Sequence, residues 1–180
     1  MNRIELQLFA DDTPKTAVKG NKIIYLFRIL EEASTTDATT IAFTTENTMT
    51  MSKDSDTTVT KDGSIRTPGE AEVEISVTAL LAKGDTMYAK LKDAMLNNKI
   101  IEIWEANLEE PVGTETNKFA GTYFQGYMTE FEKSSSSEDF TEVSTTFAVN
   151  GTGVDGDVTV SATQQAIAAY VFKDTTKTGA

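Results

Sequence analysis

Residues 70–80, EAEVEISVTAL, alternate between apolar and polar side chains more regularly than any other part of the sequence. The apolar positions are Ala71, Val73, Ile75, Val77 and Ala79, and the alternate positions from residue 70 to residue 78 hold three glutamates, a serine and a threonine. Because side chains in a β-strand alternate between the two faces of a sheet, this segment predicts a strand with one buried face and one acidic, solvated face. The rest of the chain therefore has to supply a sheet and a core that cover the apolar side.

Further strands are predicted where β-branched and aromatic residues gather. These segments are residues 22–30, 40–46, 99–108, 118–133 and 139–151. Threonine, which is β-branched and favours pleated sheet, occurs 29 times, in agreement with a mainly β chain. The last two strands flank the sequence SSSSE and predict an antiparallel hairpin. Gly121 and Gly126 mark bulges or points of close packing in the first of them.

One main helix is predicted over residues 84–97. Asp85 can cap its N-terminus, and Met87, Leu91 and Met95 repeat at the spacing of one helix face. A second, short helix is predicted within residues 161–172. The fold class is therefore mainly β with one flanking helix (α+β), arranged as a two-sheet β-sandwich or barrel.

Residues 47–69 form the longest stretch without a hydrophobic pattern. We expect residues 46–69 to be a long strand–strand loop, flanked by a β-sandwich domain that spans residues 21–174. Residues 1–20 are expected to form an N-terminal arm and residues 175–180 a polar C-terminal tail. A single domain of this size rarely keeps a long loop and two arms unless they find partners, so this organisation favours a protein built for assembly.

The sequence contains no cysteine and no histidine. Disulfides, thiol nucleophiles, Cys/His zinc sites and His-centred catalytic triads are therefore excluded. The net charge of −12 and the sequence pI of about 4.4 disfavour tight wrapping of DNA or RNA, whose phosphates an acidic surface repels. No secretion signal and no apolar run of membrane-spanning length is found, so we expect a protein that is made in a cytoplasm and does not enter a membrane.

Three acidic groups could in principle carry chemistry. Asp54, Asp56 and Asp62 do not fit a calcium loop, because the positions that require Gly and Glu hold Val59 and Ile65. The polar residues of the segment NGTGVDGD, which are Asn150, Asp155 and Asp157, fit glycine-rich turns. The glutamates of the predicted hairpin, which are Glu130, Glu132 and Glu142, could pair as in glycosidases, but their alternation with core residues favours a solvated sheet face. We therefore predict no catalytic residue, no cofactor and no metal.

Three stretches carry a more specific resemblance: DSDTTVTKDGSIRTPGEAEVEISVTALLAKGD, LKDAMLNNKIIEIWEANL and YFQGYMTEFEKSSSSEDFTEVSTTFAVNGTG. In order and spacing, roughly residues 20–174 resemble the major tail (tail tube) proteins of long, non-contractile-tailed phages of Gram-positive bacteria. The resemblance implies a structural virion protein without enzymatic activity. It also implies hexameric rings that stack into a tail tube on a tape measure protein, between an initiator (distal tail) complex and a tail terminator. Such a tube is assembled in the host bacterial cytoplasm and conducts double-stranded genomic DNA without specific binding.

The resemblance also implies two sets of functional residues. The acidic side chains expected to face the lumen are Glu70, Glu72, Glu74, Glu130, Glu132 and Glu142. The residues expected to contact a neighbouring ring or subunit through the long loop are Lys53, Asp54, Asp56, Lys61, Asp62 and Arg66. A negative, hydroxyl-lined wall would offer few contacts to a phosphate backbone; the alternative is an ordinary solvent-exposed sheet face with the same alternation.

Two other function classes stay open at this point. One is a tube or ring protein of a phage-derived bacteriocin or type VI secretion-like system, which shares the implied fold. The other is a carbohydrate-binding or adhesive β-sandwich module. Formation of a polymer separates the tube proteins from the binding module.

Overall fold

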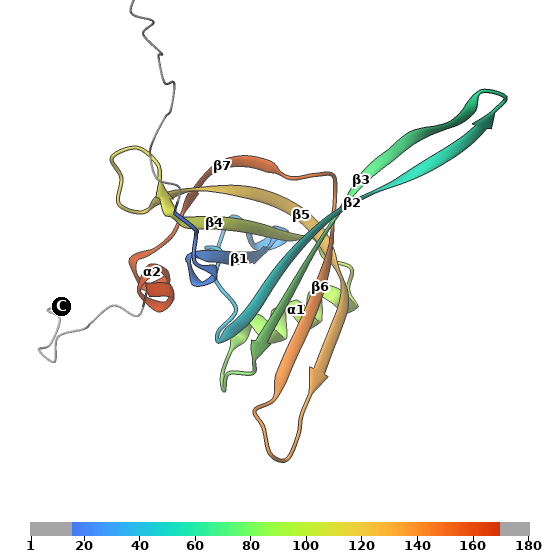
Figure 1. Cartoon of the computed structure of the whole chain (residues 1–180). Coiled ribbons are helices and arrows are strands. Elements are labelled where there is room, and N and C mark those ends of the chain that lie inside the picture. Colours follow the sequence, from blue (N-terminus) through green and yellow to red (C-terminus); the bar gives the residue numbers. More distant parts are fainter. Residues whose placement is uncertain (1–15, 170–180) are drawn as a thin grey trace, which may run out of the picture.

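The computed structural model describes residues 16–169, which form a mainly β domain (Figure 1). The strands are β1 (Ile23–Ile29), β2 (Thr44–Thr60), β3 (Gly63–Leu80), β4 (Ile101–Pro111), β5 (Lys118–Ser134), β6 (Glu142–Val149) and β7 (Val154–Thr159), the α-helices are α1 (Thr86–Leu96) and α2 (Ala162–Ala169), and two short 3₁₀ turns span Gly20–Lys22 and Leu30–Glu32. No helix among these residues is long and apolar enough to cross a membrane. The predicted class, mainly β with a flanking helix, is confirmed.

The strands pair antiparallel throughout, in the order β1-β4-β5-β6-β3-β2, with β7 alongside β5. Strand β5 belongs to two layers. Its first half pairs with β4 and β7, and its second half pairs with β6. The continuous sheet thus folds over on itself, with β1, β4, β5 and β7 in one layer and β2, β3, β6 and the end of β5 in the other (Figure 1).

Gly126 lies where β5 passes from one layer to the other. It pairs with Ile101 of β4 on one side and with Val149 of β6 on the other. A Cβ atom at this position would lie 2.2 Å from the carbonyl oxygen of Ala148. Gly121 is packed as closely, since a Cβ there would lie 2.0 Å from the carbonyl oxygen of Glu105. The predicted close packing at both glycines is confirmed.

The main core lies between the two layers. The odd-numbered residues of β3, from Val73 to Val77, are buried and face the apolar side chains of β1 and β4. Phe27 and Phe147 stack across the core with their ring centroids 5.3 Å apart. Helix α1 adds Met87 and Leu91 to the same core. Its N-terminus is fixed by the Asp85 carboxylate, which accepts a hydrogen bond from the Met87 backbone N–H at 2.8 Å, so the predicted helix and its cap are confirmed.

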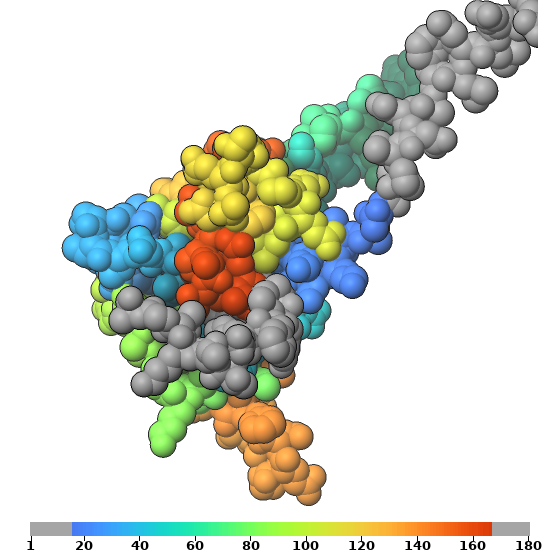
Figure 2. Space-filling model, turned by 90° about the vertical axis from the view of Figure 1, so that its left-hand side faces the viewer, coloured from blue at the N-terminus to red at the C-terminus, as the bar shows by residue number. Residues whose placement is uncertain are grey.

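A second, smaller core covers the outer side of the β1–β4–β5–β7 layer, around Leu26, Phe119 and Val160. Helix α2 lies over this side, between the segment that follows β1 and the β4–β5 loop (Figure 2). Gln164 of α2 donates a hydrogen bond to the carbonyl oxygen of Ala38 at 3.1 Å. The second predicted helix is thus present, over Ala162–Ala169 within the described residues.

Three predictions about local structure were wrong. Residues 46–69 are not a loop, because β2 and β3 pair along almost their entire length and turn at residues 61–62. The predicted strand over residues 40–46 begins only at Thr44, as the start of β2, because Phe43 has a φ of 53°. The glycine-rich turn ends at Gly153, and the residues that follow form β7 along the edge of β5. Most of the predicted N-terminal arm (residues 1–20) and all of the predicted C-terminal tail (residues 175–180) lie outside the described residues.

Candidate functional site

One face of the β2–β3–β6–β5 layer is acidic and rich in hydroxyl groups, and we call it the acidic face. Cross-strand register places its side chains in rows: Glu74 lies beside Ala148, Ser76 beside Thr146 and Thr78 beside Ser144. Its members are Glu46, Thr48, Thr50, Ser52, Glu72, Glu74, Ser76, Thr78, Tyr127, Glu130, Glu132, Ser134, Glu142, Ser144, Thr146 and Ala148. The face arises because the alternate residues of β3, β6 and the second half of β5, such as Val77, Phe147 and Met128, fill the core, whereas Met49 and Met51 of β2 stay exposed.

The charge on the acidic face has a single sign. It holds six glutamates and no lysine or arginine. Neighbouring hydroxyls pair across β3 and β6, with oxygen–oxygen distances of 3.4 Å for Ser76 and Thr146 and 3.3 Å for Thr78 and Ser144. Lys133 lies on the opposite side of β5, where its ammonium group sits 5.8 Å from the ring centroid of Tyr88. The face therefore repels anions and offers them no cationic partner.

The β2–β3 hairpin extends far beyond the body of the domain. Pairing between β3 and β6 ends at Glu74, whereas β2 and β3 remain paired to the turn after Thr60 (Figure 1). We call residues 53–70 the arm; every one of them is exposed. Its eight residues per strand give a length of about 27 Å at the usual rise of a strand. A two-stranded ribbon without a covered face is marginally stable in water, which points to a partner in the functional state.

The sequence matches a known family over most of the described domain. Residues 17–155 match the phage tail tube protein family. The chain belongs to that family. This confirms the predicted resemblance and its main functional consequence, a structural tail tube protein located in the phage tail.

Two relatives agree with the family assignment of this tail tube protein. A Staphylococcus phage phiMR25 protein, named as a tail protein, is 34% identical over 165 residues, which cover 89% of this chain and 84% of the relative. The tail tube protein of Bacillus phage SPP1 is 26% identical over 145 residues. That match covers 81% of this chain and 54% of the SPP1 protein, so the chain spans about half the length of this second relative.

Solved structures show that the fold is shared with other tubes. The SPP1 tail tube structure aligns with a TM-score of 0.68 at 23% identity and covers 91% of this chain and 93% of that chain. A gene transfer agent tail, of C6 symmetry, aligns with a TM-score of 0.57 at 10% identity, over 81% of this chain and 100% of that chain. The tube-terminating cap of the anti-feeding prophage aligns at 0.52 and 15% identity, over 86% and 100%. At these identities the likeness establishes the fold alone.

The structure of this tail tube protein brings the predicted lumen residues onto one surface. Five of the six, Glu72, Glu74, Glu130, Glu132 and Glu142, are members of the acidic face, and all are exposed. The sixth, Glu70, lies at a β-bulge where the register between β2 and β3 shifts. Sequence reasoning missed Glu46, which sits on the same face beside Thr78. It was overlooked because it stands at the boundary between the predicted strand over residues 40–46 and the predicted loop over residues 46–69.

The predicted contact residues all lie on the arm. Lys53, Asp54, Asp56, Lys61, Asp62 and Arg66 are exposed and are spread from the base of the arm to its turn. Three cations and three carboxylates leave this set neutral in a chain that carries a net charge of −12. No ion pair joins these six side chains to any residue within the described range 16–169.

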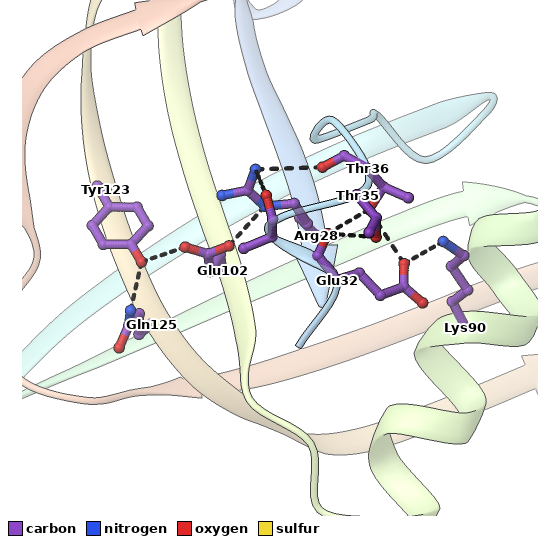
Figure 3. A network of polar contacts seen from close by, with 9 residues as sticks. Arg28, Glu32, Thr35, Thr36, Lys90, Glu102, Tyr123 and Gln125 are labelled. Atoms are coloured by element: carbon purple, nitrogen blue, oxygen red, sulfur yellow. Dashed lines mark hydrogen bonds and ion pairs between the residues drawn. The ribbon is translucent and has the colours of Figure 1, made fainter. Parts of the chain in front are cut away.

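A polar network of the tail tube protein lies away from both surfaces and ties the strands together (Figure 3). The Arg28 guanidinium pairs with the buried Glu102 carboxylate, with an N–O distance of 2.7 Å. The Tyr123 hydroxyl donates to the same carboxylate at 2.7 Å and accepts from Gln125 at 2.6 Å. Burial and the hydrogen bond to Glu102 raise the pKa of Tyr123. Glu102 lies on β4 and its partners lie on β1 and β5, so the network fixes the register of one layer.

A second ion pair in Figure 3 links the turn after β1 to helix α1, where Lys90 donates to Glu32. This hydrogen bond keeps the pKa of Glu32 below its usual value. The charged groups near the core are thus occupied in structural pairs. Within residues 16–169, no group of three acidic side chains is arranged to hold a metal ion.

Proposed function

We propose that copies of this tail tube protein close into hexameric rings, that the rings stack into a tube, and that the acidic face lines its bore. The observation that carries this proposal is the acidic face itself, with six glutamates and no cation. Proteins hold DNA chiefly through lysine and arginine contacts to phosphates. A bore without such groups lets double-stranded DNA pass without specific binding, so the protein acts as a structural conduit and not as an enzyme.

The edges of the same layer support ring closure. No described strand pairs with the outer edge of β2, and residues 127–134 of β5 pair only with β6. Open strand edges with unpaired backbone groups favour pairing with another chain. A layer with two such edges can join its neighbours into a continuous inner barrel, in which the acidic faces of all subunits point the same way.

The arm supplies the contact between rings in this proposal. It carries the six predicted contact residues at its base, along its length and at its turn. The tape measure protein, the initiator complex and the tail terminator are the further partners, with assembly in the host cytoplasm. As domain organisation we propose a tube domain over residues 21–174 with short terminal extensions.

Cysteine labelling tests the position of the acidic face, because the chain contains no natural cysteine. Glu74→Cys places a thiol near the middle of the acidic face, and Glu109→Cys places one on an exposed end of β4 as the matched control. In assembled tubes we expect a small maleimide to label both sites and a 5-kDa-scale polyethylene glycol maleimide to label only the control. Equal labelling of both sites in tubes by the large reagent would place the acidic face outside the bore.

Removal of the arm tests its role separately. Lys53 pairs with Ala71, so replacing residues 54–70 with Asn-Gly closes β2 and β3 with a two-residue turn. Because the deleted residues are exposed, we expect a folded protein with an unchanged melting temperature that forms no stacked tubes. Normal tubes from this variant would exclude the arm as the inter-ring contact.

A further inference from the structure

The end of the sheet opposite the arm carries exposed aromatic side chains. Phe43, just before β2, is 69% exposed, and Phe140, in the β5–β6 loop, is 81% exposed. Backbone hydrogen bonds hold the two segments next to β3: Leu80 N–H donates to Phe43 O at 3.1 Å, and Leu81 N–H donates to Thr141 O at 2.8 Å. Two phenylalanines thus lie exposed within about two strand spacings of each other, roughly 10 Å. We call this surface the aromatic end.

An apolar pocket adjoins the aromatic end. It lies under helix α1 and is lined by residues such as Ile41, Leu81, Phe131 and Val143. Two exposed carboxylates, Glu138 and Asp139, directly precede Phe140. The aromatic end therefore combines exposed apolar surface with negative charge.

The arm carries the complementary properties. Val59 is 82% exposed and Ile65 is 59% exposed. Val59 and Arg66 share one face of the arm, Ile65 and Asp56 lie on the other face, and Lys61 and Asp62 form the turn. None of these four charged side chains forms an ion pair with a described residue. The face that carries Val59 and Arg66 therefore fits a surface that presents aromatic rings beside carboxylates.

The two surfaces cannot meet within one chain. Strand β2 begins next to Phe43 and ends at the turn of the arm, so its 17 residues separate them by about 55 Å. A contact between them must therefore join two copies, head to tail. Such a heterologous contact leaves one arm and one aromatic end free at each step, so it can be repeated along a filament.

We propose that the aromatic end is the docking surface for the arm of a second copy of this chain, with Phe140 as its main apolar anchor. This inference rests on the proposed tube function and adds the acceptor surface that the arm engages. The apolar contact excludes water, and the carboxylates next to Phe140 pair with the cations of the arm.

Disulfide trapping tests the contact directly in the cysteine-free chain. Val59→Cys and Ile65→Cys sit on opposite faces of the arm, and each is combined with Phe140→Cys. After mild oxidation of assembled tubes, we expect a peptide that links position 140 to position 59 or 65, identified by mass spectrometry. The link must join two chains, because a disulfide requires Cα atoms within about 7 Å. Val59→Cys with Thr114→Cys, in the exposed β4–β5 loop, is the matched control and should give no such link.

A surface substitution provides a second, independent readout. Phe140→Ser should leave a folded monomer and raise the protein concentration at which tubes appear by about tenfold or more, as loss of an interface anchor does. Val154→Ser, at an apolar site on β7 that is 69% exposed, is the control and should leave that concentration unchanged. Electron microscopy of the same samples separates the two claims. Tubes without a link from position 140, or with an unchanged threshold for Phe140→Ser, overturn the docking surface alone. Failure of the unsubstituted protein to form tubes when its tail partners are supplied overturns the proposed function as well.

Discussion

Gly126→Ala tests the step at which β5 passes from one layer of the sheet to the other. The new methyl carbon would lie 2.2 Å from the carbonyl oxygen of Ala148, whereas ordinary contacts begin near 3.4 Å. The strands would have to separate locally by about 1 Å, which strains the packing and weakens the pairing of Gly126 with Val149. Overpacking of this kind costs about 1–3 kcal/mol, and each weakened backbone hydrogen bond adds about 1 kcal/mol. We therefore expect the free energy of unfolding to fall by about 2–4 kcal/mol.

Urea unfolding followed by circular dichroism measures this change. With a slope of about 2 kcal/mol per M, the midpoint should fall by about 1–2 M. Gly156→Ala is the matched control, because a Cβ there meets no atom within 4 Å. The control should change stability by no more than about 0.5 kcal/mol. If Gly126→Ala unfolds at the same urea concentration as the control, β5 does not make the close crossing described above.

Two further predictions concern a buried tyrosine and the acidic face. Burial, and to a smaller extent a hydrogen bond to Glu105, raises the pKa of Tyr25 above its ordinary value of 10.0. The Tyr25 hydroxyl therefore ionises at a lower pH in the unfolded state than in the folded state, and the stability it contributes, which is complete below pH 10, is lost as the pH rises further. Between pH 8 and 11, the urea midpoint should fall less steeply with pH in Tyr25→Phe than in the unsubstituted protein. Equal slopes in the two proteins would contradict this prediction. In a phage that carries this protein, Glu72→Lys combined with Glu74→Lys should leave tubes intact but slow DNA ejection, most strongly at low salt. The control, Glu109→Lys combined with Glu110→Lys, should not slow ejection. Ejection at the wild-type rate from the first variant would show that Glu72 and Glu74 do not line the channel.

The sequence predicted those elements whose side chains record a difference between a buried and a solvated side. Residues 70–80 show a period of two because β3 has the core on one face and solvent on the other. Helix α1 was found because Asp85 caps it and because Met87 and Leu91 lie on the one side that packs. In both cases the pattern of burial is written directly into the order of apolar and polar residues.

The arm escaped detection for the opposite reason. Both of its faces are exposed, so no hydrophobic alternation marks residues 53–70, and only their threonine content favoured a strand. Strand β7 was missed because it is a short edge strand with glycine and aspartate, which are typical of turns. Of the candidate site, the glutamates could be placed on strands, but their assembly into one face depends on the register between strands that are distant in the sequence. Pairing of β3 with β6, about 70 residues away, cannot be read from local patterns.

The most direct test of the account is cryo-electron microscopy of tubes formed by the purified protein, with the tail initiator and tape measure proteins added if the protein alone stays monomeric. We expect hollow tubes built of six-fold rings, in which Glu74 and Glu132 point into the bore and the arm crosses to the adjacent ring. A tube whose bore is lined by another face of the domain would contradict the central claim, as would a protein that stays monomeric in the presence of those partners.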